Sequence, residues 1–382
     1  MYLKRGNIPH KRHTVYKSKE GAFYYEQLFG TEGFNGKASL LYHLEGPTQI
    51  TSLGKAVSVA PRAAVEHNIA PRKLEGFNIA ATDDFLESRT ILFFNNFINI
   101  GLAMPKQSMT DYFYKNGDAD EMLFIHKGKG TLHTLFGDLA FTEGDYVVIP
   151  RGCIYQIELE STDNKILFLE SRDEIWFPKN YLNRFGQLME HSPFCERDLR
   201  APEFVEPIKA TGEFPIKIRK EGMLHTVNYK THPFDVVGWD GYHYPFAMSI
   251  HDFEPITGRV HQPPPVHQTF GTRSYVVCSF VPRLFDYHPE AIPAPYNHSN
   301  IDSEEILYYV DGDFMSRKGI RPGQFTLHTG GIPHGPAPGT MEKSIGAKST
   351  EELAVMIDTF HPLKLTQAAL DIEDPTYLTS WL

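Results

Sequence analysis

Two histidines and one glutamate in the C-terminal half of the sequence have the residue types and the order of a metal site. His298 lies seven residues before Glu305, and His334 follows after a glycine-containing turn. Two neutral imidazoles and one carboxylate on one face of an ion leave three coordination positions open, which suits non-haem Fe(II) that must bind a substrate and O2. The stretch from His298 to His334 contains no cysteine, which weighs against a structural zinc site. We therefore predict that these three residues hold a metal ion.

The carboxylate could come from either of two adjacent residues, Glu304 and Glu305. Successive side chains of a strand point to opposite sides, so only one of the two can face inward. Glu305 is separated by six residues from Gly312, and the same spacing separates Glu121 from Gly128 in the first half of the chain. This repeat favours Glu305 and keeps Glu304 as the alternative.

A longer pattern that contains these spacings occurs twice. Each copy reads Glu-x6-Gly and then Gly-x5-[Pro/Thr]-x-Gly-x2-[Tyr/His]. Its fixed positions are Glu121, Gly128, Gly144, Pro150, Gly152 and Tyr155 in the first copy and Glu305, Gly312, Gly323, Thr329, Gly331 and His334 in the second. Offsets that recur in two halves indicate a duplicated unit, whose glycines mark hairpin ends that need a positive φ. The first copy ends in Tyr155, and the residues just before Glu121, from Tyr114 to Asp120, contain no histidine. We therefore expect this copy to be structural and without a metal.

Short β-prone runs broken by Gly, Asp or Pro fill two blocks of the chain, such as those at 145–150 and 306–314. We predict four segments. They are an irregular, partly β N-terminal arm over 1–90, a first barrel that has lost its metal site over 91–175, a connector with little regular structure over 176–225, and a second, metal-binding barrel over 226–382.

The repeated pattern resembles the signature of the cupins, in which the first motif supplies histidines and a glutamate and the second supplies the last histidine. The resemblance implies an all-β fold in which each unit is a jelly-roll barrel of two Greek keys. Two such units in one chain make a bicupin.

The region around the predicted site resembles the homogentisate 1,2-dioxygenases. The similar segments are PAPYNHSN at 293–300, the glutamate pair at 304–305, LHTGGIPHGP at 327–336, FDVVGWDG at 234–241, FVPR at 280–283 and the closing run MIDTFHPLKL at 356–365. The start of the chain is similar to a shorter bacterial branch of that family. The resemblance implies that homogentisate and O2 are converted to 4-maleylacetoacetate in tyrosine and phenylalanine catabolism.

The resemblance also assigns roles to individual residues. His298, Glu305 and His334 would be the Fe(II) ligands, although Glu304 would restore the histidine-to-glutamate spacing of the better-known branch. A further histidine would act as acid–base at a ring hydroxyl, and His261 is favoured over His267 by its spacing to the prolines that follow. The remaining substrate-side candidates are His334 itself, His328 just before it, Tyr296 and Phe314.

Phe314 is a departure from that family, which has a substrate-contacting tyrosine at this position. A missing hydroxyl means either that Tyr296, Tyr308 or Tyr309 binds the substrate carboxylate, or that the substrate differs. Another hydroquinone such as gentisate and a non-catalytic, metal-binding bicupin are therefore the alternatives. A sugar-phosphate isomerase would need the basic residues Arg317, Lys318 and Arg321 at the site, and a solvated hairpin accounts for these more simply.

The bulk composition indicates which partners and which cellular compartment to expect. A net charge of −10 disfavours nucleic acid and anionic membranes, despite the basic run at 4–12. Three scattered cysteines, with no apolar leader and no apolar run of about 18 residues, favour a reducing cytoplasm. We expect a homo-oligomer whose partners are a small aromatic substrate and O2.

Overall fold

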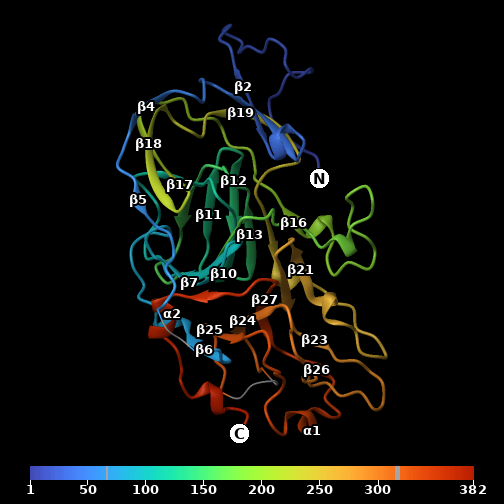
Figure 1. Ribbon diagram of the computed structural model, residues 1–382. Coiled ribbons are helices and arrows are strands. Elements are labelled where there is room, and N and C mark those ends of the chain that lie inside the picture. The colour runs from blue at the N-terminus through green and yellow to red at the C-terminus, as the bar shows by residue number, and fades with distance from the viewer. Residues whose placement is uncertain (66–67, 315–318) are drawn as a thin grey trace.

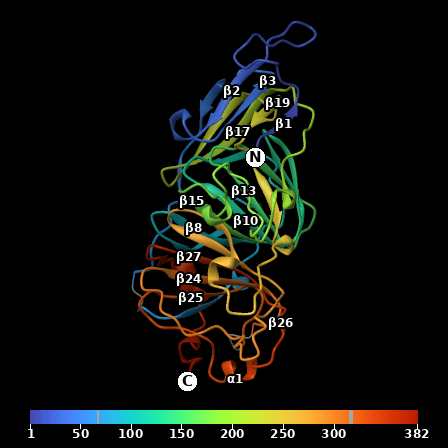
Figure 2. The same ribbon diagram turned by 90° about the vertical axis from the view of Figure 1, so that its right-hand side faces the viewer.

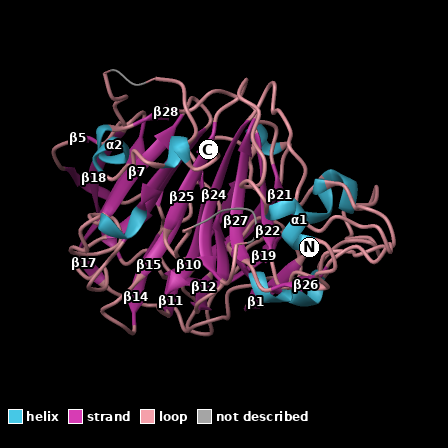
Figure 3. Cartoon of the chain, turned by 90° about the horizontal axis from the view of Figure 1, so that it is seen from below, coloured by secondary structure: helices cyan, strands magenta, loops and turns pink. Residues whose placement is uncertain are grey.

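The computed structural model describes residues 1–65, 68–314 and 319–382, and strands dominate it. The strands lie in three tiers, with a small N-terminal sheet at one end, a barrel in the middle and the C-terminal sheet at the other end (Figures 1 and 2). Seen from below, the strands run side by side and the short helices lie at the periphery (Figure 3). No helix within the described ranges has the length and apolar character needed to cross a membrane.

The N-terminal tier is a sheet whose strands come from both ends of the first 241 residues. Its order is β1 (Leu3–Gly6), β19 (Val236–Gly241), β3 (Ala38–His43) and β2 (Tyr25–Gly30). Leu40, Tyr42 and Val237 form its small buried core. This arm therefore depends on β19, which lies in the chain between two strands of the middle tier, β18 (Met223–Thr231) and β20 (Phe246–Ser249).

The middle tier consists of two facing sheets. One has the order β16 (Leu199–Arg200), β20 (Phe246–Ser249), β13 (Asp145–Ile149), β10 (Asp120–Lys127), β15 (Lys165–Ser171), β8 (Ile98–Ala103), β7 (Arg89–Phe94) and β28 (Lys364–Leu365). The other has the order β12 (Gly137–Phe141), β11 (Gly130–Thr134), β14 (Tyr155–Leu159), β9 (Phe113–Asn116), β17 (Thr211–Lys220), β18 (Met223–Thr231) and β4 (Ile50–Leu53), with β5 (Val57–Ser58) also on β18.

The C-terminal tier is a sheet with the order β21 (Gln268–Gly271), β22 (Tyr275–Phe280), β27 (Leu353–Thr359), β24 (Glu304–Asp311), β25 (Gln324–His328) and β6 (Arg72–Glu75). The pair β23 (Arg283–Leu284) and β26 (Ser349–Thr350) lies beside it. The helices are α1 (Thr340–Ser344), α2 (Gln367–Asp371) and the 3-10 turns η1 (Glu32–Phe34), η2 (Gly76–Asn78), η3 (Lys179–Tyr181), η4 (Glu196–Asp198), η5 (Ile250–Asp252), η6 (Pro264–His267) and η7 (Tyr377–Thr379).

Alternation along β10 explains how the tiers pack. Met122 and Phe124 point into a core shared with the C-terminal sheet, whereas Leu123 and Ile125 point into the core of the middle barrel. A sheet covered on both faces needs strands that are apolar on both sides, and β10 is buried from Asp120 to Ile125. The same alternation sends Glu121 into the middle barrel.

The two halves share one register, which supports the duplication predicted from the spacing. Glu121 pairs with Ile149 on one neighbouring strand and with Glu170 on the other. Glu305 pairs in the same way with His328 and with Asp358. The all-β, two-barrel cupin fold is confirmed.

The segment boundaries differ from those predicted. The expected connector over 176–225 contains β17 and the start of β18, which form a long hairpin on the middle barrel. The predicted boundary at 226 placed β19 and β20 in the second barrel. In the structure β19 pairs with β1 of the N-terminal tier, and β20 pairs with β13 of the middle tier. β17 shows no apolar run because much of it faces solvent, so its sequence pattern is weak.

The two halves also exchange strands. β6, within the predicted N-terminal arm, is an edge strand of the C-terminal sheet beside β25 (Figure 1). β28, from the C-terminal half, extends the middle sheet beside β7. Neither barrel is therefore complete without a strand from the other half.

Candidate metal centre

The three predicted ligands lie together in the structure. Glu305 is the second residue of β24, His298 lies in the segment before that strand, and His334 follows β25. Their potential ligand atoms all lie within 4.8 Å of one another. Glu305 Oε2 is 3.6 Å from His298 Nε2, and Glu305 Oε1 is 3.7 Å from His334 Nε2. This is a cluster in which one ion can reach all three side chains.

Backbone hydrogen bonds hold the two histidines beside each other and fix the direction of their rings. His298 and His334 form an isolated antiparallel bridge with N–H to carbonyl distances of 2.8 and 2.9 Å. The Nδ1 atoms face the carbonyl oxygens of Tyr296 and Ile332 at 3.2 and 3.3 Å, so each Nδ1 carries the hydrogen in a neutral ring. Both Nε2 lone pairs are then available to a metal.

The structure distinguishes between the two adjacent glutamates. The Glu304 carboxylate accepts a hydrogen bond from the backbone N–H of Leu363 at 2.6 Å, and so fixes the chain after β27. Glu305 lies on the face of β24 that carries Tyr309, opposite the face of Ile306. Glu305 is therefore the carboxylate beside the imidazoles.

The donor set fits a divalent cation. Nε2 of His334 is buried and has no hydrogen-bond partner in the described part of the chain, and the same holds for Oδ1 of Asp358. Burial, and after it the charge of Glu305, raise the pKa of Asp358 to about 8. Burial opposes ionisation of Glu305 too, but hydrogen bonds from the histidines outweigh it and hold the pKa of Glu305 well below its usual range. A buried carboxylate beside an imidazole nitrogen that has no hydrogen-bond partner is suited to bind a cation, because the cation would neutralise the one and be a partner for the other.

A cavity of about 250 Å³ opens beside this cluster. Its lining consists of Pro71, Asn297, Pro333, His334, Gly335 and Trp381. The lining is mainly apolar, with one amide and one imidazole, and a lining of this composition suits a small aromatic molecule.

Family models for the two halves of one enzyme match most of the chain. A homogentisate 1,2-dioxygenase N-terminal model matches residues 74–250, and the corresponding C-terminal model matches residues 255–382. This chain belongs to the homogentisate 1,2-dioxygenase family. The two family models meet between residues 250 and 255. This agrees with the structure, in which β20 pairs with β13 of the middle barrel.

Individual known proteins differ in how similar they are to this chain. A protein of Saccharolobus solfataricus named "Putative dioxygenase" is 43% identical over all of this chain and 98% of its own length. The homogentisate 1,2-dioxygenase of Mus musculus is 24% identical over 75% of this chain and 67% of its own length, so this chain spans about two thirds of it. A solved cupin 2 barrel protein of Leptotrichia buccalis covers 80% of this chain and is itself covered in full, at 10% identity and a TM-score of 0.32.

The two acid–base candidates occupy different surroundings in this family member. The side chain of His261 is 60% exposed, its Nδ1 lies 3.4 Å from Asp286 Oδ2, and its ring lies edge-on to Tyr296 at 5.4 Å. Tyr296 in turn lies 6.1 Å from His298 between ring centroids. His267 packs on Phe280, and its Nδ1 has no hydrogen-bond partner within 1–65, 68–314 and 319–382. Burial, and after it the charge of Arg283, lower the pKa of His267 to about 3.

Of the other predicted substrate-side residues, only some lie near the cluster of His298, Glu305 and His334. His328 contacts Glu305 directly, with its Nδ1 2.6 Å from Oε1. Phe314 packs on Tyr309 in a small apolar cluster, with the ring centroids 4.6 Å apart. Tyr308 is removed from the substrate candidates, because it lies on the other face of β24 and its hydroxyl is hydrogen-bonded to His126 Nδ1 at 2.9 Å.

Of the basic residues weighed for a phosphate site, Arg321 pairs with Glu75 at 2.9 Å. Arg317 and Lys318 lie outside the described residues. The one placed residue of this cluster therefore has a structural partner in β6.

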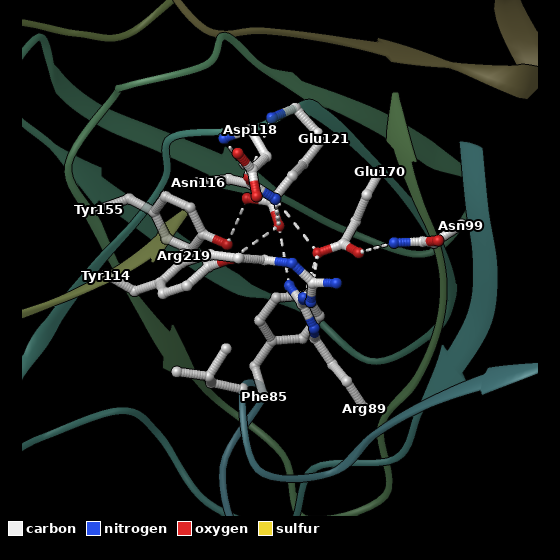
Figure 4. A network of polar contacts seen from close by, with 12 residues as sticks. Phe85, Arg89, Asn99, Tyr114, Asn116, Asp118, Glu121, Tyr155, Glu170 and Arg219 are labelled. Atoms are coloured by element: carbon white, nitrogen blue, oxygen red, sulfur yellow. Dashed lines mark hydrogen bonds and ion pairs between the residues drawn. The ribbon is translucent and has the colours of Figure 1, made fainter. Parts of the chain in front are cut away.

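The matching position in the middle barrel of this dioxygenase holds a guanidinium (Figure 4). Arg89 Nη1 lies 2.8 Å from Glu121 Oε1, and the same guanidinium pairs with Glu170. Arg219 lies 3.1 Å from Glu170, and the Tyr155 hydroxyl donates to Glu121 Oε2 at 2.8 Å. The paired carboxylates that face each other in both barrels are thus neutralised here by arginine.

Sequence reasoning missed Arg89, Asp358 and Tyr377. Arg89 lies in β7, before the repeated motif, and Asp358 lies in a segment that was noted only for its family likeness. Glu170 and Asp358 pair in the same way with Glu121 and Glu305 in the structure, but they follow these glutamates at different offsets in the sequence, so the repeat did not point to Asp358. The other two lie far from the motif, so no spacing points to them.

Proposed function

We propose that this chain is a ring-cleaving dioxygenase that converts homogentisate and O2 to 4-maleylacetoacetate, with Fe(II) held by His298, Glu305 and His334. The observation that supports this proposal is the convergence of two Nε2 atoms and one carboxylate in a chain of this family. The Nε2 of His334 is buried and has no hydrogen-bond partner among the residues that the structure describes. Two imidazoles and a carboxylate with positions left open are typical of non-haem Fe(II) oxygenases.

The chain's own residues would bind, orient and deprotonate the substrate. Bound Fe(II) would supply the redox chemistry that lets O2 react with an aromatic ring. His261 has its Nδ1 directed to Asp286, so its Nε2 is the atom that would take the proton of a ring hydroxyl. Asp286 would stabilise the imidazolium that forms. Asn297 and the apolar lining of the cavity would orient the ring.

The test is oxygen uptake by the full chain after anaerobic reconstitution with Fe(II). With homogentisate we expect uptake and a new absorbing ring-fission product. His334→Ala should abolish both, whereas His10→Ala, which changes an exposed histidine of the N-terminal arm, should leave both intact. Uptake that persists in His334→Ala would show that the metal site has been assigned to the wrong residues.

A hydroquinone other than homogentisate is the second candidate. Phe314 supplies no hydroxyl, and the described lining of the cavity contains no lysine or arginine to pair with a substrate carboxylate. Homogentisate, gentisate and unsubstituted hydroquinone should therefore be compared by kcat/KM under the same conditions. If homogentisate is the substrate, Phe314→Tyr should raise or maintain its kcat/KM, and a clear preference for another hydroquinone would replace the first proposal.

A further inference from the structure

The C-terminal tail of the chain lies against the strand next to the metal centre. After α2 it returns along β6, which is paired with β25, the strand that ends at His328 (Figure 1). Its contacts with β6 are Glu75 N–H to Ile372 O at 2.8 Å, Asp374 N–H to Lys73 O at 2.8 Å, Arg72 to Glu373 at 2.6 Å and Lys73 to Asp374 at 2.8 Å. Backbone bonds and ion pairs together fix the place at which η7 begins.

Tyr377, the first residue of η7, is linked to Glu305 of the metal centre by two hydrogen bonds through His328. The hydroxyl of Tyr377 lies 3.0 Å from Nε2 of His328, and Nδ1 of His328 lies 2.6 Å from Oε1 of Glu305. Tyr377 and His328 are both buried, and their rings are nearly parallel. A link of three polar groups therefore runs from the tail to the carboxylate of the triad.

The direction of these hydrogen bonds follows from the groups involved. A carboxylate can only accept, so Nδ1 of His328 carries the hydrogen that it donates to Glu305. The other nitrogen of a neutral imidazole is then an acceptor, so the Tyr377 hydroxyl donates to it. Tyr377 thereby favours the one tautomer of His328 that can hold Oε1 of Glu305.

We propose that Tyr377 is a positioning residue of the metal centre, which acts through His328 to reserve Oε1 of Glu305 for a hydrogen bond and leave Oε2 for the ion. Oε2 lies 3.6 Å from Nε2 of His298, while Oε1, which accepts from His328, lies 3.7 Å from Nε2 of His334. Ligation through one oxygen keeps coordination positions open for substrate and O2, which is what the proposed function on which this inference rests requires. The tail also reaches the other ligand loop, because Trp381 Nε1 donates to the carbonyl of Gly335, next to His334, at 3.1 Å.

The test is Co2+ binding to the metal-free full chain, followed by the visible spectrum of the bound ion. Tyr377→Phe keeps the ring and removes the hydroxyl, and we expect Co2+ affinity to fall about tenfold or more, as for the loss of other hydrogen bonds behind metal ligands. We also expect a changed Co2+ spectrum, because Oε1 of Glu305 is released to the ion.

Tyr308→Phe is the matched control. It removes a buried tyrosine-to-histidine hydrogen bond from the same strand as Glu305, but on the opposite face. Its Co2+ affinity should equal that of the unmodified chain. Thermal unfolding of both metal-free variants separates a loss of packing from a loss of ligand position.

A double-mutant cycle tests whether Tyr377 acts through His328. His328→Gln combined with Tyr377→Phe should bind Co2+ as His328→Gln does alone, because the link is already broken. Unmodified affinity in Tyr377→Phe, or additive losses in the double variant, would overturn the inference. If Tyr377→Phe does not fold, unmodified affinity in His328→Gln overturns it equally. Failure of the unmodified chain to bind Co2+ would instead count against the proposed function.

Discussion

Glu304 and Glu305 are neighbours on β24, and their side chains lie on opposite faces of the sheet. Glu304 accepts the backbone N–H of Leu363, and Glu305 lies between the imidazoles of His298 and His334. Both side chains are largely buried, so burial does not distinguish them. Their partners do, since one binds a backbone amide and the other can bind a cation.

Substitution of the two glutamates should therefore have separate effects. We expect Glu305→Gln to abolish tight Fe(II) binding, because the charged ligand is lost and Asp358 is not part of the cluster formed with His298 and His334. Glu304→Gln keeps an oxygen acceptor for the Leu363 amide and should retain Fe(II), with at most about 1–2 kcal/mol of stability lost. Iron content after gel filtration, together with thermal unfolding, measures both. Retention of iron by Glu305→Gln alone would reassign the carboxylate to Glu304.

The two acid–base candidates can be separated kinetically. We expect His261→Gln to lower kcat by about 10²–10⁴ with iron content unchanged, as for the loss of a general base. His267→Gln should have a smaller effect on kcat, because a histidine whose pKa is lowered to about 3 is a weak base. Oxygen-uptake kinetics and iron analysis give the comparison. A greater loss of kcat in His267→Gln would transfer the role to that residue.

Arg89 should matter for folding rather than for catalysis. Arg89→Met leaves Glu121 and Glu170 facing each other in the barrel interior, and removal of one partner of a buried ion pair costs about 3–5 kcal/mol. Chemical unfolding should show this loss, whereas Arg184→Met, at an exposed position, should change stability by less than about 0.5 kcal/mol.

A compensating change checks the electrostatic origin of that effect. After Arg89→Met, Glu170 still pairs with Arg219, whereas Glu121 has lost its guanidinium partner. Glu121→Gln added to Arg89→Met removes that uncompensated charge and should recover part of the stability. If the double variant is no more stable than Arg89→Met, the role of Arg89 is packing instead of charge.

His126 predicts a dependence of stability on pH. Its Nδ1 is hydrogen-bonded to the Tyr308 hydroxyl between the two barrels, and burial lowers the pKa of His126 to about 4. The unfolded chain takes up this proton near pH 6.5 and the folded chain only near pH 4, so stability is present above 6.5 and falls as the pH drops towards 4. From pH 7 to 5 the fall from this one group is about 2 kcal/mol.

His126→Gln removes this titration and keeps an acceptor for Tyr308. The free energy of unfolding of the variant, measured in urea at several pH values between 7 and 5, should decline less than that of the unmodified chain. Equal declines would show that other groups cause the acid sensitivity.

Most of the candidate site followed from the sequence, because a metal restricts the residue types that can hold it. His298, Glu305 and His334 were identified by ligand chemistry and by offsets that recur in the two halves, and the all-β fold by short apolar runs between turns. Such signals are local, since a hairpin glycine or an alternating strand is written within a few residues.

The strand exchange between the barrels, the guanidinium of Arg89 beside Glu121, and the contact of Tyr377 with His328 were decided by the tertiary structure alone. Each joins segments that are far apart in the chain, through hydrogen bonds or ion pairs. Interactions of that kind depend on which strands become neighbours, and they leave no periodicity or spacing in the sequence from which the partner could be read.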